Sequence, residues 1–187
     1  MSSSRMSRDD RRHHLLDTAW RLIGEEGADA LKLAEVARLG GVSKPIAYDH
    51  FGSRAGLLSA LYDRYYTRHI DSVAAALSSD DTVDAAAATI ATAYVGCVLE
   101  SGAVAAALAG AMSGASDLDA MKQDCDDRYL ALCKGALERC AGHAPDPLAL
   151  VGFLGAAASI AQHVVLGRVD RTEADRFLGA LLVASVD

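Results

Sequence analysis

The chain of 187 residues lacks the motifs that would identify an enzyme, a metalloprotein or a secreted protein. It contains no GxGxxG, no P-loop pattern, no HExxH and no GxSxG, so the common nucleotide-binding, metalloprotease and hydrolase sites are absent. Its four cysteines have no CxxC spacing, and no signal peptide is recognisable, which predicts reduced thiols in a cytoplasmic protein. We therefore expect no catalytic residues, no metal and no cofactor.

Aromatic residues are scarce, at 5% of the chain, and few stretches alternate in the manner of a β-strand. Alanine, leucine and valine supply much of the 51% hydrophobic content, which predicts an all-α fold with a substantial core. The longest apolar run, residues 148–161, is too short for a transmembrane helix. It predicts a buried helix instead.

Positive charge is in deficit overall, since the net charge is −7, but the deficit is unevenly distributed. Residues 1–54 hold nine Lys/Arg against eight Asp/Glu, whereas the rest holds nine against seventeen. A partner with a negative surface therefore remains compatible with the N-terminal region. An arginine-rich arm precedes the first expected helix, and it either contacts phosphate or is a frayed, solvated tail; its members are Arg5, Arg8, Arg11 and Arg12.

The stretch 33–51, LAEVARLGGVSKPIAYDHF, reads as two short helices joined by a glycine turn. Apolar residues at helical spacing form the first helix, and Gly40-Gly41 ends it. Ser43 is a suitable N-cap for the second helix, with Pro45 in its first turn. This pattern predicts a helix-turn-helix whose second helix has the size to enter a DNA major groove. Its expected DNA-binding residues are Lys32, Ser43, Lys44, Pro45, Ile46, Tyr48 and His50.

The flanking sequence makes the pattern more specific. An amphipathic helix over residues 15–27 precedes it, and a helix capped by Ser53 follows it. The run from Leu15 to Leu58 resembles the N-terminal DNA-binding domain of the TetR family of transcriptional regulators, through the elements LL.TA..L, EEG, L.EVA...GVSK, Y.HF and S...LL. The chain departs from that family pattern at the cap of the helix before the turn, which is Leu31-Lys32, and at Ala34, Ala47 and Asp49.

The remaining sequence predicts further helices, about nine in total, in the order that the resemblance implies. We expect a DNA-binding domain over 1–52, with a flexible N-terminal arm, and a helical ligand-binding and dimerisation domain over 53–187. Glycine, proline and capping residues delimit the expected helices. These helices cover about 53–77, 82–101, 103–112, 117–141, 146–167 and 172–186, with Asp146 and Thr172 as the caps of the last two.

The helix over 146–167 is apolar nearly all round, so it must be covered on every side. One side can face a second copy of the chain, and in the TetR family the two C-terminal helices pair with their copies in a dimer. The alternative is a core within one chain. The residues expected at the dimer interface are Phe153, Ala157, Val164, Phe177 and Leu181.

Two groups of polar residues lie on otherwise apolar helix faces. Cys125, Cys133 and Cys140 lie within about 80° of one another on one helix, but axial gaps of about 10 Å or more separate them, too far for one metal. They read better as buried small side chains. The second group predicts an apolar cavity with a few convergent polar groups, where the family resemblance implies a small-molecule effector. Its members are Tyr65, His69, Tyr94, Met112, Tyr129, Gln162 and His163.

These observations favour a ligand-responsive regulator, a repressor in our interpretation, that binds a pseudo-palindromic DNA operator as a homodimer. The expected partners are double-stranded DNA, a small-molecule effector and a second copy of the chain, with no membrane. Two alternatives stay open at this point: a dimeric helical adaptor without DNA binding, and an all-α enzyme.

Overall fold

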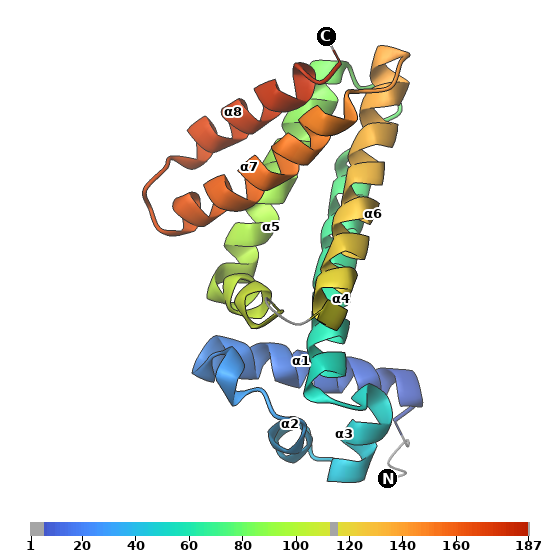
Figure 1. Ribbon diagram of the computed structural model, residues 1–187, viewed down its shortest axis with the longest axis vertical. Helices are drawn as coiled ribbons and strands as arrows, with labels where there is room; N and C mark the ends of the chain where they lie inside the picture. Colours follow the sequence, from blue (N-terminus) through green and yellow to red (C-terminus); the bar gives the residue numbers. More distant parts are fainter. Residues whose placement is uncertain (1–5, 113–115, 187) are drawn as a thin grey trace, which may run out of the picture. The chain divides into compact units, whose positions relative to one another are not determined.

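The computed structural model describes residues 6–112 and 116–186, and these contain helices and no strand, as the sequence predicted (Figure 1). Eight α-helices and one short 3-10 helix follow one another along the described residues: α1 (Arg8–Glu26), η1 (Ala28–Ala30), α2 (Leu33–Leu39), α3 (Lys44–Phe51), α4 (Arg54–Ala76), α5 (Val83–Met112), α6 (Ser116–Ala141), α7 (Pro147–Val165) and α8 (Arg171–Val183).

The chain divides into two compact units. Unit 1 comprises Met1–Arg64 and Ala103–Met121, and unit 2 comprises Tyr65–Gly102 and Lys122–Asp187. Helices α4, α5 and α6 therefore contribute residues to both units. The functional limit expected between residues 52 and 53 falls between α3 and α4 and stays a prediction.

Unit 1 is built around the apolar face of α1, which packs against η1 and α2, while α2 packs against α3. Leu15, Leu16 and Leu22 are almost fully buried on this face. Trp20, the only tryptophan in the chain, lies half-buried in the same helix. Arg64 of α4 pairs with Asp17 and donates a hydrogen bond to the carbonyl oxygen of His13 at 3.2 Å, which ties α4 to α1.

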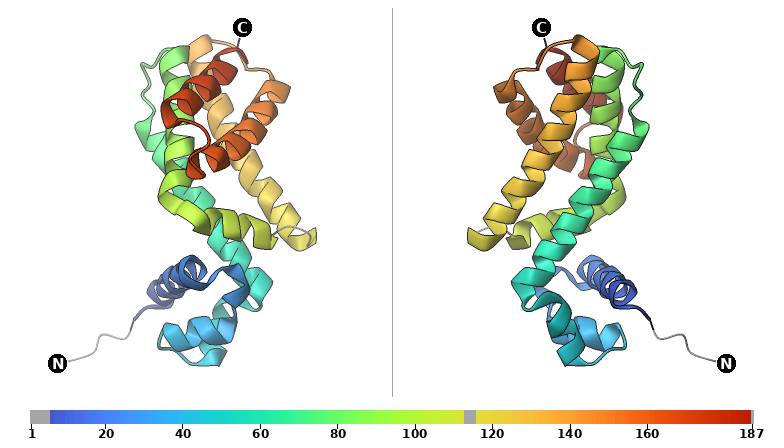
Figure 2. Two further views of the ribbon diagram at one scale, coloured as in Figure 1. Left: turned by 90° about the vertical axis from the view of Figure 1, so that its left-hand side faces the viewer. Right: turned by 90° about the vertical axis from the view of Figure 1, so that its right-hand side faces the viewer.

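Unit 2 contains the later part of α4, the earlier part of α5, most of α6, and α7 with α8. Helices α7 and α8 form an antiparallel pair in both side views (Figure 2). Tyr66 of α4 donates a hydrogen bond to Asp126 of α6 at 2.9 Å, and Arg128 of α6 donates one to Thr67 at 3.0 Å. The core of this unit combines small residues of α5 with aromatic residues of α4, α5, α6 and α7.

Most helix ends agree with the capping residues in the sequence. Ser7 accepts a hydrogen bond from the backbone N–H of Asp10 at 3.0 Å, and Asp146 accepts one from Leu148 at 2.8 Å. The cap predicted for the last helix is wrong: Asp170, and not Thr172, accepts the bond from Glu173 at 3.1 Å. Both side chains can cap, and the helix uses the one that comes first in the chain.

The break predicted at Gly102 is confirmed. Gly102 has the non-helical angles φ 55° and ψ −141°, so α5 consists of two helices that meet at a kink. These two arms of α5 correspond to the helices expected over 82–101 and 103–112. Only glycine adopts this backbone conformation without strain, which explains why the kink lies there.

Two helices are long and apolar enough to span a membrane by length and composition alone, namely α5 and α7. The core helix of a soluble protein passes the same test, so the observation is weak evidence. However, only 22% of the most apolar window of α7 is buried within this chain. The buried helix predicted over 148–161 is therefore only partly covered within one copy of the chain, and apolar surface is left exposed.

Candidate nucleic-acid interface and buried aromatic cluster

The turn between α2 and α3 depends on two glycines with different roles. Gly41 has φ 66°, which favours glycine. Gly40 has an ordinary φ of −79°, but a Cβ there would lie 2.7 Å from Cδ2 of Leu15 in α1. His14 of α1 also contacts this turn, since its Nε2 lies 3.1 Å from the carbonyl oxygen of Gly40. The turn is therefore held against α1, and it fixes the direction in which α3 leaves.

Helix α3 begins at the predicted residue but without the predicted hydrogen bond. Ser43 is the N-cap in an extended conformation, and its hydroxyl accepts no capping bond. Pro45 lies in the first turn, where its missing N–H costs little. The exposed hydroxyl of Ser43 is thus not used by the helix itself.

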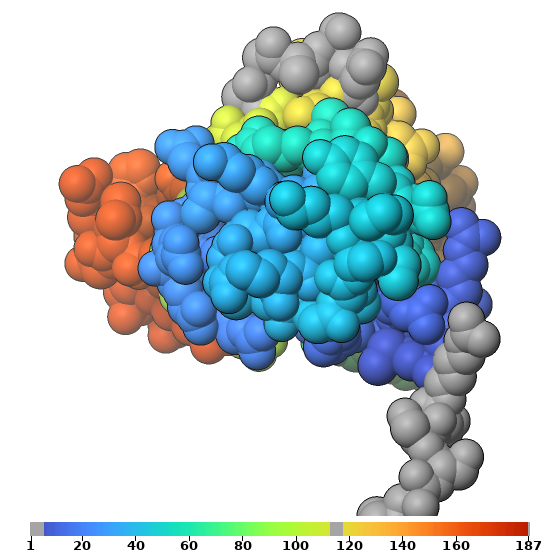
Figure 3. All heavy atoms as spheres, turned by 90° about the horizontal axis from the view of Figure 1, so that it is seen from below, coloured from blue at the N-terminus to red at the C-terminus, as the bar shows by residue number. Residues whose placement is uncertain are grey.

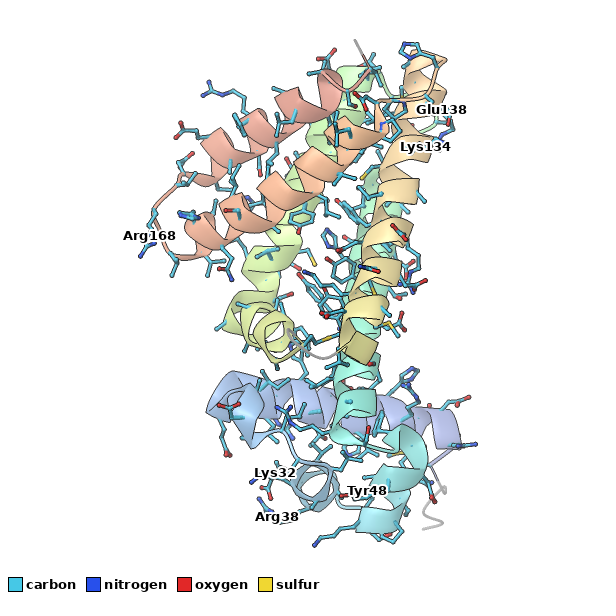
Figure 4. The ribbon with its side chains drawn as sticks, viewed as in Figure 1. Lys32, Arg38, Tyr48, Lys134, Glu138 and Arg168 are labelled. Atoms are coloured by element: carbon cyan, nitrogen blue, oxygen red, sulfur yellow. The ribbon has the colours of Figure 1, made fainter. Side chains whose placement is uncertain are left out.

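The two faces of α3 are clearly different. Ala47 and Phe51 are buried against the rest of unit 1, while Lys44 is exposed and Tyr48 is 51% exposed. Figure 3 views the side of unit 1 on which α2 and α3 lie, and Figure 4 labels Lys32, Arg38 and Tyr48. The exposed face therefore presents an ammonium and a phenol, which can donate to phosphate. Lys32 and Pro45 are exposed as well, whereas Ile46 and His50 are half-buried.

Arg38 on α2 is an exposed cation that the sequence interpretation missed. Its guanidinium pairs with the Glu35 carboxylate, with an N–O distance of 2.5 Å. The spacing of three residues between Glu35 and Arg38 was the available signal. Because this pair is intrahelical and mostly exposed, it orients the guanidinium more than it stabilises the fold.

The arginine-rich arm is helical over most of its length, so the interpretation of a frayed tail is wrong from Arg8 onward. Arg8, Arg11 and Arg12 lie in the first turns of α1, and Arg5 lies outside the described residues. The guanidinium of Arg12 is 5.3 Å from the ring centroid of Phe51 at the end of α3. Burial and the charges of these three arginines lower the pKa of His50 below its ordinary value of 6.5. The start of α1 thus forms one basic cluster with the end of α3.

The junction between α3 and α4 is closely packed. Ser53 caps α4, as predicted, by accepting a hydrogen bond from the backbone N–H of Gly56 at 3.1 Å. A Cβ on Gly56 would overlap the carbonyl oxygen of Phe51. Arg54 donates to the carbonyl oxygens of Ala28 at 2.8 Å and Leu31 at 3.0 Å. Arg54 is therefore occupied in holding unit 1 together.

An aromatic cluster occupies the core of unit 2. The ring centroid of His69 on α4 lies 5.0 Å from that of Tyr94 on α5 and 5.0 Å from that of Tyr129 on α6. Phe153 of α7 lies 6.4 Å from Tyr94. Burial lowers the pKa of His69 from 6.5 to about 4 and raises the pKa of Tyr129. Three helices, α4, α5 and α6, thus bring together three of the predicted effector residues, and Phe153 of α7 lies beside them.

The other predicted effector residues are distributed differently. Tyr65 is half-buried beside this cluster, 6.4 Å from His69 between ring centroids, and burial together with Cys97 raises its pKa. Met112 is buried in unit 1. The expectation that Gln162 and His163 face inward is wrong, because both are exposed and His163 Nδ1 lies 3.0 Å from the carbonyl oxygen of Ser159. Helix α7 is apolar on several faces, so its sequence did not reveal which face is covered.

The cysteines of α6 are core residues. Cys125 and Cys133 are fully buried thiols, Cys140 is half-buried, and burial raises the pKa of Cys133 to about 12. Within the described residues, no cluster of histidine, cysteine or acidic side chains could hold a metal ion. A groove of about 640 Å³ does lie between α5 and α8, with Asp84 and Asp175 on its walls, but none of the predicted effector residues lines it.

The uncovered apolar surface of α7 and α8 differs from the predicted dimer interface. Phe153 and Ala157 are buried in the core of their own chain, so their assignment to a dimer interface is wrong. Val164 and Leu181 are half-buried, and Phe177 is 52% exposed. The largest exposed apolar side chains on this side of unit 2 are Leu148, Val151, Val165, Leu166 and Phe177.

Comparisons with known proteins agree with this geometry. Residues 15–61 match the family model described as bacterial regulatory proteins, tetR family. The regulator BetI of Rhizobium meliloti is 38% identical over 72 residues, which cover 38% of this chain and 36% of BetI. The activator FasR of Mycolicibacterium smegmatis is 36% identical over 74 residues, which cover 40% of this chain and 34% of FasR. The matched region thus spans about a third of the length of these curated relatives.

Solved structures extend the likeness of fold to nearly the whole chain. A TetR-like transcriptional regulator from Rhodococcus sp. RHA1 has a TM-score of 0.70 and 19% identity, and covers 95% of this chain and 96% of its own. The regulator FadR of Bacillus subtilis, solved in complex with stearoyl-CoA, has a TM-score of 0.76 and 16% identity, and covers 94% and 99%. At such identities the likeness concerns the fold. The named relatives and structures are transcriptional regulators and not enzymes.

Proposed function

From the match of residues 15–61 to the family model of bacterial regulatory proteins of the tetR family, we propose that the protein is a transcriptional repressor released by a small molecule. In this proposal two copies of the chain bind a pseudo-palindromic operator, and each inserts its α3 into a major groove. The observation that carries the proposal is the exposed face of α3, on which Lys44 and Tyr48 project while Ala47 and Phe51 are buried.

Each exposed group on this face has a defined role in the proposal. Lys44, Tyr48 and His50 bind phosphate oxygens and set the register, with Lys32 and the Ser43 hydroxyl as further donors. Pro45 and Ile46 contact thymine methyl groups in the groove. Asp49 is exposed beside them, and its carboxylate repels phosphate unless it accepts from a cytosine amino group.

In this proposal, a homodimer formed through α7 and α8 supplies the two copies of α3 that bind the two halves of the operator. The exposed apolar side chains, from Leu148 at 77% to Val165 at 41%, support this assignment. Gly152 and Gly155 are exposed on the same helix and allow a second helix to approach closely. The interface that we propose therefore includes Leu148 and Val151 in place of Phe153 and Ala157.

Release from DNA is assigned to an effector bound in unit 2. The aromatic cluster of His69, Tyr94 and Tyr129, with Tyr65 beside it, is the part of unit 2 best suited to a mostly apolar ligand. Tyr65 and His69 lie one turn apart on α4, the same helix that begins at the α3 junction. The effector must bind the DNA-free conformation more tightly than the DNA-bound one to act as an inducer.

The test is a salt titration of binding to a random-sequence DNA duplex, measured by fluorescence anisotropy. Wild-type affinity should fall steeply with salt, and Lys44→Ala should reduce the slope by about one per subunit. Lys134→Ala is the matched control, because it removes the same charge from the exposed surface of α6 (Figure 4). If the wild type shows no salt-dependent binding to DNA, the proposed function as a DNA-binding regulator is refuted. If the two variants have equal salt slopes, the proposed contact of Lys44 on α3 with phosphate is refuted.

A further inference from the structure

Three buried side-chain atoms of unit 2 have no hydrogen-bond partner. One is Oδ1 of Asp175 on α8, and the other two belong to the aromatic cluster: Nε2 of His69 and the hydroxyl oxygen of Tyr129. His69 is 2% exposed and Tyr129 is fully buried, so neither atom is hydrated by bulk solvent. Leaving such groups unpaired costs free energy, and native proteins seldom do so without a functional reason. Their ring centroids are 5.0 Å apart, so the two side chains are direct neighbours in the core.

The surroundings of this pair are aromatic and uncharged. Tyr94 lies 5.0 Å from His69 and 5.6 Å from Tyr129 between ring centroids. The Cys133 thiol lies one turn beyond Tyr129 on α6. A thiol is only a weak hydrogen-bonding group, so a ligand hydroxyl or carbonyl would replace it beside the Tyr129 hydroxyl. Among the described residues, the buried polar side chains other than tyrosine and cysteine are Thr18, His69 and Ser185, so no arginine, lysine or whole carboxylate side chain is buried beside this pair. Asp126, which accepts from Tyr66, is only half-buried. A charged ligand group would therefore find no countercharge.

We infer that the effector is an uncharged, mostly apolar molecule with one hydroxyl or carbonyl group, which pairs with His69 Nε2 and the Tyr129 hydroxyl. The inference rests on the proposed effector site in unit 2 and names the class of molecule that fits it. The low pKa of His69 agrees with a neutral imidazole at pH 7. A ligand hydroxyl suits either tautomer of that imidazole, because it can donate to one group and accept from the other.

Three probes that share one ring frame test the class of ligand. They are 1-naphthol, naphthalene and 1-naphthoate, and their binding to the full-length protein is measured at pH 7 by equilibrium dialysis without DNA. We expect 1-naphthol to bind roughly tenfold more tightly than naphthalene, because it satisfies the unpaired groups. We expect 1-naphthoate to bind weakest, because its carboxylate is desolvated without a cation.

The variant Tyr129→Phe separates ligand binding from a purely structural role of the Tyr129 hydroxyl, because the two roles predict different changes in Tm and in ligand preference. Removing an unpaired buried hydroxyl should raise the Tm of the ligand-free protein while reducing the preference for 1-naphthol over naphthalene to about one. Tyr66→Phe is the matched control. Its hydroxyl already donates to Asp126 at 2.9 Å, so this variant should lower the Tm and keep the preference.

Two results would overturn the inference. One is that the wild type binds the three probes equally or binds none of them. The other is that Tyr129→Phe lowers the Tm and keeps the preference, which would mean that an ordered water satisfies the hydroxyl. Because no DNA is present in either assay, failure here leaves the proposed DNA-binding function standing, and that function fails only in the salt titration.

Discussion

At the scale of single residues, Gly56 marks the tightest contact around the α3–α4 junction. Replacing it with alanine places a methyl group onto the Phe51 carbonyl oxygen, a backbone atom that cannot rotate away. We expect Gly56→Ala to reduce the free energy of unfolding by about 1–3 kcal/mol, as overpacking does. Gly110→Ala is the control, because a Cβ there meets nothing within 4 Å and alanine favours helix. Urea denaturation of both variants measures the difference; equal effects would mean that the junction adapts freely.

His69 should make the stability of the protein depend on pH. Its pKa is about 4 when folded, against an ordinary value of 6.5. Between these values the unfolded chain binds a proton that the folded chain does not. As far as His69 is concerned, the free energy of unfolding should therefore stay constant above pH 6.5. It should decrease by up to about 3 kcal/mol as the pH is lowered toward 4.

The measurement is urea denaturation between pH 7 and pH 4.5 at one protein concentration. His69→Phe should remove most of this acid-sensitive component. His143→Gln, which changes an exposed histidine, should retain it. An identical pH profile for wild type and His69→Phe would show that another group is responsible.

At the scale of elements, the start of α1 should act together with α3 on DNA. Arg8 is exposed, and among the three arginines its charge has the largest effect on the pKa of His50, which lies on α3. We expect Arg8→Gln to weaken binding to all duplex sequences alike and to lower the salt slope by about 0.9 per subunit. Arg168→Gln, on the exposed loop between α7 and α8 (Figure 4), is the control. A change in sequence preference instead would mean that Arg8 contacts bases.

The elements also differ in how far the sequence could predict them. Glycines and caps determine where helices end, so the limits of α3 and α4 and the kink at Gly102 follow from local sequence. The sequence predicts Thr172 as the cap of the last helix, whereas Asp170 caps it, because both residue types can accept the capping bond. Helix α7 has apolar residues on several faces, so the buried side that contains Phe153 and Ala157 becomes evident only from the packing of α7 in unit 2. The cluster of His69, Tyr94 and Tyr129 joins three distant helices, and spacing along one helix carries no information about such contacts.

At the scale of the whole molecule, the uncovered apolar surface of α7 and α8 should produce a dimer. Light scattering at micromolar concentration should give twice the chain mass of 19.5 kDa. Phe177→Glu should give monomers, because it places a charge on the apolar contact. Leu39→Glu is the matched control, since Leu39 is 40% exposed on α2, outside this surface, and the variant should remain dimeric. A wild-type mass of a single chain would contradict the assigned interface.

The location of Trp20 in α1 has an optical consequence. Unit 1 contains the only indole in the chain, while the aromatic cluster of unit 2 is made of tyrosine, phenylalanine and histidine rings. Tryptophan emission therefore reports on the surroundings of α1. A change in this emission when a non-fluorescent ligand binds in unit 2 would indicate that unit 1 responds to that ligand. The unlabelled protein thus carries its own spectroscopic readout of communication between its two units.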